Sequence, residues 1–154
     1  MLLRRDRALL ALDIALDVAF HTQASQAQAG GAALTGAAEI AARLGQARRG
    51  IEPLLQALVR AGVLDSVRGP RGGYRLARPA RELPLTAVTA LCTEEEPPPP
   101  PAGRLAAAVS APLWSALEED VQARLGTLTL ADLLERAARA GLRPPAQDAL
   151  DFVI

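Results

Sequence analysis

The chain has few of the residues on which several protein classes depend. It contains one cysteine, Cys92, and one histidine, His21. An intrachain disulfide and a zinc-finger spacing are therefore excluded, and an intracellular protein is favoured. Aromatic residues make up only 3% of the chain, although 50% of it is hydrophobic. The core must then consist mainly of Leu, Ala and Val, which favours packed helices over a β-sandwich.

Long apolar runs and catalytic motifs are also missing. Charged residues at positions 4–7 interrupt the apolar N-terminus, and Asp13 and Asp17 divide the stretch that follows. Neither a signal peptide nor a membrane span is expected, so we predict a cytoplasmic protein without a membrane partner. The sequence has no P-loop, no GxSxG motif and no paired metal ligands. We therefore predict that the protein is not an enzyme.

Lysine is absent, and the arginines are unevenly distributed. Residues 43–81 carry nine arginines against two acidic residues, whereas residues 82–154 carry eleven acidic residues against five arginines. A basic middle segment beside an acidic second half suggests a surface for nucleic acid or another polyanion. The alternative is an ordinary solvated surface whose charges happen to be lopsided.

The spacing of apolar residues predicts a helix over 6–20, followed by a flexible loop over 22–36 and a short helix up to Gly45. Thr35 is the expected N-cap of the short helix. The inner face of the first helix is expected to comprise Leu9, Leu12, Leu16 and Ala19.

A second helix runs from about residue 51 to Gly62, and a hairpin follows it directly. Because proline is tolerated in the first turn of a helix, Pro53 places the start near residue 50 or later. Residues 63–67 and 74–77 are β-prone, and a Gly-rich turn joins them. The arginines that flank this turn are Arg68, Arg71 and Arg75.

The second half of the chain is expected to be helical around a proline-rich break. Residues 85–91 predict a short helix, and five consecutive prolines at 97–101 favour an extended linker. Another helix covers residues 112–126, and Thr129 caps a last one that Gly141 ends. The apolar stripe of the 112–126 helix comprises Leu113, Leu117 and Val121, with Trp114 beside it.

Two short helices followed by a basic hairpin have the order of a winged helix-turn-helix. We therefore predict a mainly α fold with a small β-hairpin wing and a C-terminal dimerisation helix. The second helix would enter the major groove of DNA, and the wing would contact phosphates or the minor groove. The alternative, a basic turn on an ordinary α+β domain, is less consistent with a hairpin placed directly after two helices. The predicted segments are a DNA-binding domain over 1–91, an acidic and proline-rich loop over 92–104, a helical dimerisation segment over 105–141 and a tail over 142–154.

Residues 39–78 resemble a known family. AEIAARLG followed by LVRAGVLDSVRGPRGGYRLAR is similar to the Rrf2-type winged helix-turn-helix regulators, which include IscR, NsrR and CymR. The wing sequence is the most specific part, and LPLTAVTAL and TLTLADLL also match the family's layout. The resemblance extends over most of the chain and implies a transcription regulator that binds double-stranded DNA.

The resemblance also implies roles for individual residues. Glu52 falls at an acidic, base-contacting position of the recognition helix, where a carboxylate can accept from a cytosine amino group. A solvated helix residue is the alternative for Glu52. Arg48 and Arg49 fall at the entry of this helix, where phosphate or base contacts occur, and Tyr74 is expected to pack the wing against the core. The predicted wing comprises Arg68, Arg71, Gly72, Gly73, Tyr74 and Arg75.

The chain departs from the family at several positions. Arg71 stands where relatives carry Gly, and Pro53 stands where they carry a polar helix former. Residues 45–51 include no Ser, Thr or Asn, so the usual N-cap of the recognition helix is missing. Cys92 falls at the first of three cysteines that hold an iron–sulfur cluster in the sensing members. Since one thiolate per subunit cannot hold an ordinary cluster, we predict that the chain carries no cofactor.

Two functions remain open from the sequence. We expect a homodimeric, sequence-specific regulator, acting as a repressor, whose apolar stripe at 113–121 packs across a two-fold axis; packing within its own subunit is the alternative for the stripe. The second function is a protein-interaction module that keeps the fold without reading DNA and docks through residues 94–101. Cys92 is expected to be a small core or loop residue, with a redox switch as its alternative. No effector is indicated.

Overall fold

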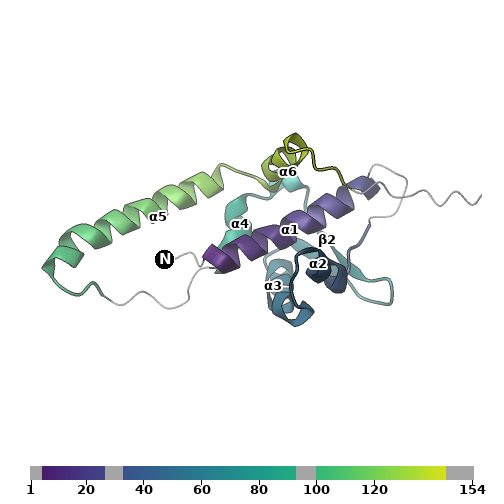
Figure 1. Cartoon of the computed structure of the whole chain (residues 1–154), viewed down its shortest axis with the longest axis horizontal. Helices are drawn as coiled ribbons and strands as arrows, with labels where there is room; N and C mark the ends of the chain where they lie inside the picture. Colours follow the sequence, from purple (N-terminus) through teal and green to yellow (C-terminus); the bar gives the residue numbers. More distant parts are fainter. Residues whose placement is uncertain (1–4, 27–32, 93–99, 145–154) are drawn as a thin grey trace, which may run out of the picture.

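The computed structural model describes residues 5–26, 33–92 and 100–144. Within them the two strands pair antiparallel, and the predicted fold class, mainly α with a small hairpin wing, is confirmed. Figure 1 shows α1 through the middle of the molecule, with α2, α3 and the hairpin on one side, α6 on the other and α5 extending outwards. The elements are α1 (Arg5–Gln26), α2 (Ala37–Arg43), α3 (Arg48–Arg60), β1 (Leu64–Val67), β2 (Gly73–Leu76), α4 (Leu85–Thr89), α5 (Ala111–Gly126) and α6 (Leu130–Arg139), with 3₁₀ turns at Ala80–Glu82 and Ala90–Cys92.

The buried face of α1 differs from the expected one. Leu9 is 46% exposed, Leu12 and Leu16 are only half-buried, and Ala19 alone of the predicted face is fully buried. Since α2, α3, α4, α6 and β2 all contact this helix, close packing favours short or β-branched side chains on its inner side. The buried face comprises Ala8, Ala11, Ile14, Ala15, Val18 and Ala19.

Two helices extend beyond their predicted bounds. α1 continues to Gln26, so the predicted loop over 22–36 is wrong at its start, where Ala and Gln are adequate helix formers; residues 27–32 lie outside the described residues. α3 begins at Arg48, earlier than expected, and contains Pro53. A proline removes only one helical hydrogen bond, and the buried apolar side chains of α3 hold its first turns against the core.

The turn between α2 and α3 agrees with the sequence, but the beginning of α2 does not. Gly45 ends α2 with a φ of 63°, as predicted. Gly36, not Thr35, is the N-cap, and its N–H donates to Oε2 of Glu39 at 3.1 Å. Thr35 lies one residue before the cap, where its backbone pairs with Tyr74 of β2 in an isolated β-bridge and its hydroxyl accepts from Arg43 and donates to Glu39.

The hairpin and α6 join the same core. The register pairs Leu64 with Leu76 and Val67 with Gly73, and β2 lies against α1. Leu130 of α6 is fully buried in the core, although the sequence places it in the segment expected for dimerisation. α6 is capped by Thr129 as predicted. We call α1 to α4, the hairpin and α6 together the head.

α5 leaves the head as an arm (Figure 1). A π turn at Ala106–Ser110 leads into it, so the helical segment begins before the predicted residue 112. The wider π turn gives room for the ring of Pro112, which would clash with the carbonyl four residues earlier in a regular helix. Among the helices of the described residues, none combines the length and the apolar character that a membrane span requires. Residues 93–99 of the predicted loop and 145–154 of the predicted tail lie outside the described part of the chain.

Candidate nucleic-acid interface

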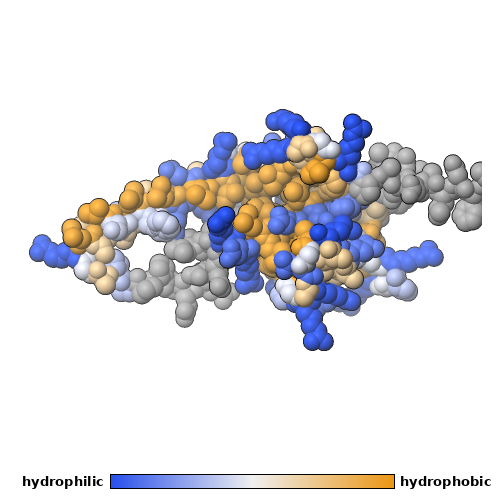
Figure 2. All heavy atoms as spheres, viewed as in Figure 1, coloured by the Kyte–Doolittle hydropathy of each residue, from blue (hydrophilic) through white to orange (hydrophobic). Residues whose placement is uncertain are grey.

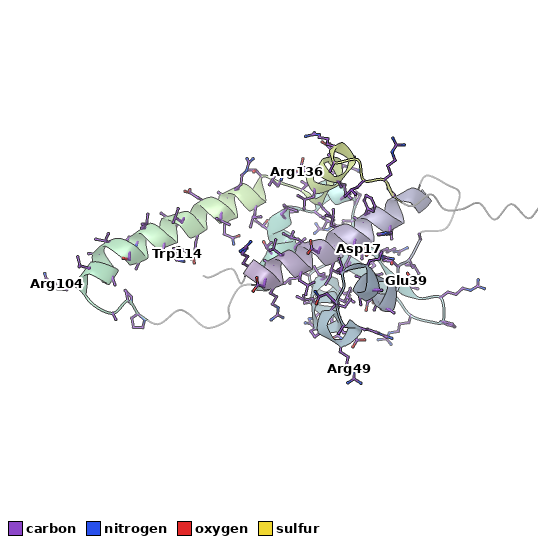
Figure 3. The ribbon with its side chains drawn as sticks, viewed as in Figure 1. Asp17, Glu39, Arg49, Arg104, Trp114 and Arg136 are labelled. Carbon is purple, nitrogen blue, oxygen red and sulfur yellow. The ribbon has the colours of Figure 1, made fainter. Side chains whose placement is uncertain are left out.

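The first turns of α3 present charged side chains to solvent. Nε of Arg48 donates to Oε1 of Glu52 at 3.0 Å, and the two side chains are 65% and 42% exposed. Arg49 makes no hydrogen bond or ion pair with the described residues, and Figure 3 shows it pointing away from the body of the molecule. Ala47 precedes the helix without a side-chain cap, as predicted. Arg49 and the uncapped N–H groups of this turn are therefore available to an anion.

The wing tip is a tight turn that only glycine allows at two positions. Gly69 has a φ of 121°, and its carbonyl accepts from the N–H of Gly72 at 3.0 Å. A Cβ on Gly72 would collide with the carbonyl oxygen of Val67. Arg68 and Arg71 are exposed on this tip, and neither pairs with another described residue. The turn thus holds two free guanidinium groups outwards.

Arg75 does not share this environment. It lies in the middle of β2, opposite Asp65 of β1, and its Nη2 is 3.6 Å from Oδ2 of that residue. The arginine is therefore partly neutralised within the hairpin ladder. The sequence predicted Arg75 beside the tip because it is close to the tip along the chain. In the structure it pairs with Asp65 on the opposite strand.

The base of the wing is fastened to the segment before α2. The N–H of Thr35 donates to the carbonyl of Tyr74 at 3.0 Å, and the N–H of Tyr74 donates back to the carbonyl of Thr35 at 2.9 Å. A Cβ on Gly73 would lie 2.7 Å from the same Thr35 carbonyl oxygen. Tyr74 packs against the core, as predicted. The wing is thus held at a fixed position beside α2 and α3.

A side-chain network that sequence reasoning missed connects α1, α2 and the wing. Nε of Arg43 donates to Oδ1 of Asp17 at 2.9 Å, and its Nη2 donates to Oδ2 at 2.7 Å. The same Nη2 donates to Oγ1 of Thr35 at 2.6 Å. Asp17 is only 8% exposed, and its hydrogen bond raises the pKa of Arg43, which keeps the guanidinium charged. Since 26 residues separate the partners, no local spacing signals this pair.

The surface of α3 and the wing keeps a positive excess. The only acidic residues of the basic segment, Glu52 and Asp65, are already paired with Arg48 and Arg75. In Figure 2, hydrophilic side chains gather over α3 and the hairpin, whereas apolar side chains follow the length of α5. Within the described residues, the arginines of α3 and the wing that remain without an ion pair are Arg49, Arg68 and Arg71, and Arg60 at the far end of α3.

The arm exposes an apolar stripe. The four residues predicted to mediate dimerisation are between 47% and 60% exposed, and Leu105 and Val109 continue the stripe towards the start of the arm. A contiguous apolar patch of this kind is unusual on the surface of a monomer and marks an interaction site. The four predicted residues are Leu113, Trp114, Leu117 and Val121.

Cys92 is a buried residue of the core rather than a ligand exposed in a loop. Burial raises the pKa of its thiol, and Arg7 opposes that shift only in part. It is the one cysteine of the whole chain, and the described residues contain no group of three or more His, Cys, Asp or Glu side chains that could hold a metal ion. These donors do not fit an iron–sulfur cluster, which needs several thiolates.

Comparison with known proteins agrees with this geometry. A family model described as Rrf2, "Iron-dependent Transcriptional regulator", matches residues 12–136. The chain is 31% identical over 128 residues to the HTH-type transcriptional regulator IscR of Cereibacter sphaeroides, which covers 78% of this chain and 83% of that protein. It is also 30% identical over 106 residues to Protein rrf2 of Nitratidesulfovibrio vulgaris, covering 65% of this chain and 71% of that protein.

Solved structures show the same fold. T. potens IscR superposes with a TM-score of 0.69 at 24% identity and covers 88% of both chains. CymR (YrzC), the global cysteine regulator of B. subtilis, superposes with a TM-score of 0.63 at 25% identity, over 88% of this chain and 98% of that one. The relatives are regulators and not enzymes, as predicted. The chain belongs to the Rrf2 family of winged-helix, DNA-binding transcriptional regulators.

Proposed function

We propose that the chain is a sequence-specific regulator that binds double-stranded DNA as a homodimer, with α3 in the major groove and the wing against the backbone. The free guanidinium groups of Arg49, Arg68 and Arg71, which have no partner among the described residues, carry this proposal. Such groups neutralise phosphates and release counterions, which is the main source of affinity for DNA. Action in the cytoplasm, by repression of a promoter that the dimer occupies, is our prediction from the family.

The arm supports the dimeric part of the proposal. Its exposed stripe runs for several turns, from Leu105 to Val121, and would bury much apolar surface against the same stripe of a second copy. Such a contact is self-complementary about a two-fold axis. A two-fold dimer presents two copies of α3 to DNA, and they read half-sites about 34–36 Å apart. We therefore expect a palindromic site.

Capture of sheared genomic DNA by the purified protein, at low and at moderate salt, tests the proposal. We expect a shared, two-fold symmetric site, and an affinity that falls about a thousandfold between roughly 50 and 200 mM salt for about 6–10 phosphate contacts. Arg68→Ala combined with Arg71→Ala should weaken binding to all sequences and reduce the salt dependence. Arg139→Ala is the matched control, because this exposed arginine lies on α6 and is paired with Glu135.

The results separate the two functions left open by the sequence. Recovery of random, salt-sensitive fragments would contradict sequence specificity. Recovery of no DNA at either salt concentration would favour the protein-interaction module. Unchanged affinity in the double arginine variant, with the site still recovered, would remove the wing from the interface.

A further inference from the structure

A hollow of about 200 Å³ lies in the head, between α1, the end of α2 and the end of α6. Engineered apolar cavities of about 150 Å³ bind benzene, so this hollow has room for a ligand of about one ring. Figure 3 shows Asp17 on the stretch of α1 that contributes to it. The lining is mostly apolar, with three polar side chains: Leu16, Phe20, Leu44, Ala137 and Leu142, and Asp13, Asp17 and His21.

The polar groups leave one negative charge without a partner. Asp17 is neutralised by its paired hydrogen bonds from Arg43. Nδ1 of His21 donates to the backbone carbonyl of Asp17 at 2.8 Å and lies 3.3 Å from Oδ1 of the same residue. Asp13 is exposed to solvent and has no hydrogen bond or ion pair with the described residues, and partial desolvation raises its pKa. A carboxylate beside an apolar surface gains from a cationic partner.

We propose that this hollow binds a small organic monocation, with an apolar body of about one ring and an amine that pairs with Asp13. The apolar lining accepts the body, and the single unpaired carboxylate selects the charge. Another conceivable occupant is the chain's own tail, residues 145–154. That segment carries Asp148 and Asp151 and no basic residue, so its charges repel Asp13. Charge complementarity therefore favours the cation.

The same site is connected to the DNA-binding elements. Asp17 holds Arg43, and Arg43 holds Thr35, whose backbone pairs with Tyr74 at the base of the wing. Leu44, which also lines the hollow, is the C-cap of α2. A ligand that contacts Asp17 and Leu44 would therefore shift the positions of α2 and the wing. This coupling rests on the proposed function, whereas the binding site itself does not.

Isothermal titration calorimetry on the full chain tests the site, with benzylamine, benzyl alcohol and benzoate as probes. We expect saturable 1:1 binding of benzylamine, at least ten times tighter than benzyl alcohol, and no binding of benzoate. Asp13→Asn should reduce the affinity for benzylamine to that for the alcohol, with an unchanged unfolding temperature. Asp6→Asn is the matched control, since this exposed carboxylate lies on the same helix outside the hollow. Ala137→Phe should fill the hollow and abolish binding.

Three results would overturn the site. Equal affinities for the amine and the alcohol would remove the charge selection, and unchanged binding in folded Ala137→Phe would locate the ligand elsewhere. Binding of benzylamine only after Phe152→Ala would assign the hollow to the tail.

The coupling has a separate readout, the DNA affinity of the wild type and of Asp13→Asn with and without saturating benzylamine. We expect at least a twofold change in the wild type only. If benzylamine binds normally in calorimetry but the DNA affinity does not change, the coupling is overturned and the binding site still stands. Calorimetric binding by a protein that binds no DNA supports the site and contradicts only the proposed function.

Discussion

α3 and α5 both carry apolar side chains at helical spacing, yet these side chains are buried in α3 and exposed in α5. The four core side chains of α3 are 3% exposed or less, whereas the four side chains of the α5 stripe are 47% exposed or more. The period of a sequence therefore predicts that a helix forms and which of its sides is apolar, but not what covers that side. α3 is covered by its own chain, whereas the described residues leave the stripe of α5 exposed. The buried set of α3 is Ile51, Leu54, Leu55 and Leu58.

The largest effect is expected where the arm loses its apolar face. Leu117→Glu places a charge in the centre of the stripe, and burial of an unpaired carboxylate at an interface is strongly unfavourable. We expect a monomer at micromolar concentration and at least a hundredfold weaker binding to a palindromic site. Sedimentation velocity and fluorescence anisotropy measure the two quantities. The unfolding temperature of the head should change little, because Leu117 is not part of its core.

The control for this variant is Ser115→Glu, which adds the same charge to the same helix. Ser115 is exposed and lies two residues from both Leu113 and Leu117, which places it on the opposite side of the helix. It should remain dimeric. A dimer in both variants would show that the arm is not the interface and would remove the contrast between α3 and α5.

In the head, the largest loss of stability is expected at the partly buried ion pair of Asp17 and Arg43. Asp17→Asn removes the charge that accepts from Arg43 and leaves the guanidinium without its counterion. We expect a loss of about 2 kcal/mol in the free energy of unfolding, less than for a fully buried pair because Arg43 is partly exposed. Urea denaturation measures this loss. Glu135→Gln, which breaks the exposed pair with Arg139, should cost less than about 0.5 kcal/mol, and equal losses in both variants would contradict the structural role of Asp17.

A smaller loss is expected at the base of the wing. Gly73→Ala adds a Cβ that would lie 2.7 Å from the carbonyl oxygen of Thr35, so the backbone pairing of Thr35 and Tyr74 must move apart. We expect a destabilisation of about 1–2 kcal/mol, with faster hydrogen exchange at the N–H of Thr35. Gly50→Ala meets no atom within 4 Å and should stabilise α3 by up to about 1 kcal/mol. A neutral Gly73→Ala would show that the wing is not fastened there.

The sequence predicted the elements of the head better than their packing. Turn chemistry is local, so the stop at Gly45, the cap at Thr129 and the hairpin follow from neighbouring residues. The prediction for the inner face of α1 was wrong, because a helix that is contacted from several sides buries its small residues rather than its leucines. The pair of Asp17 and Arg43 was missed, since only the fold brings the two residues together.

The predicted interface shows the same division. The exposed positions of Arg49, Arg68 and Arg71 follow from the helix entry and the Gly-rich turn, which are local features of the sequence. The partner of Arg75, by contrast, depends on the register of the hairpin. Local patterns thus identified the charged positions, and the cross-strand pairing decided which of these charges remain free.

The smallest effect is expected at Glu52, whose replacement should change the preference among DNA sequences more than the overall affinity for DNA. The exposed pair of Glu52 and Arg48 contributes less than about 0.5 kcal/mol to stability, so Glu52→Ala should unfold at nearly the wild-type temperature. Loss of the carboxylate frees Arg48 for phosphate, which should raise binding to random DNA slightly and steepen its salt dependence. If Glu52 accepts from a cytosine amino group, discrimination at one base pair of each half-site should fall by about 1–3 kcal/mol. Binding to a set of single-base operator variants measures this, with Gln56→Ala, exposed on the next turn, as the control. Unchanged discrimination together with an unchanged salt slope would make Glu52 an ordinary surface residue and leave the reading of bases to the arginines of the same helix.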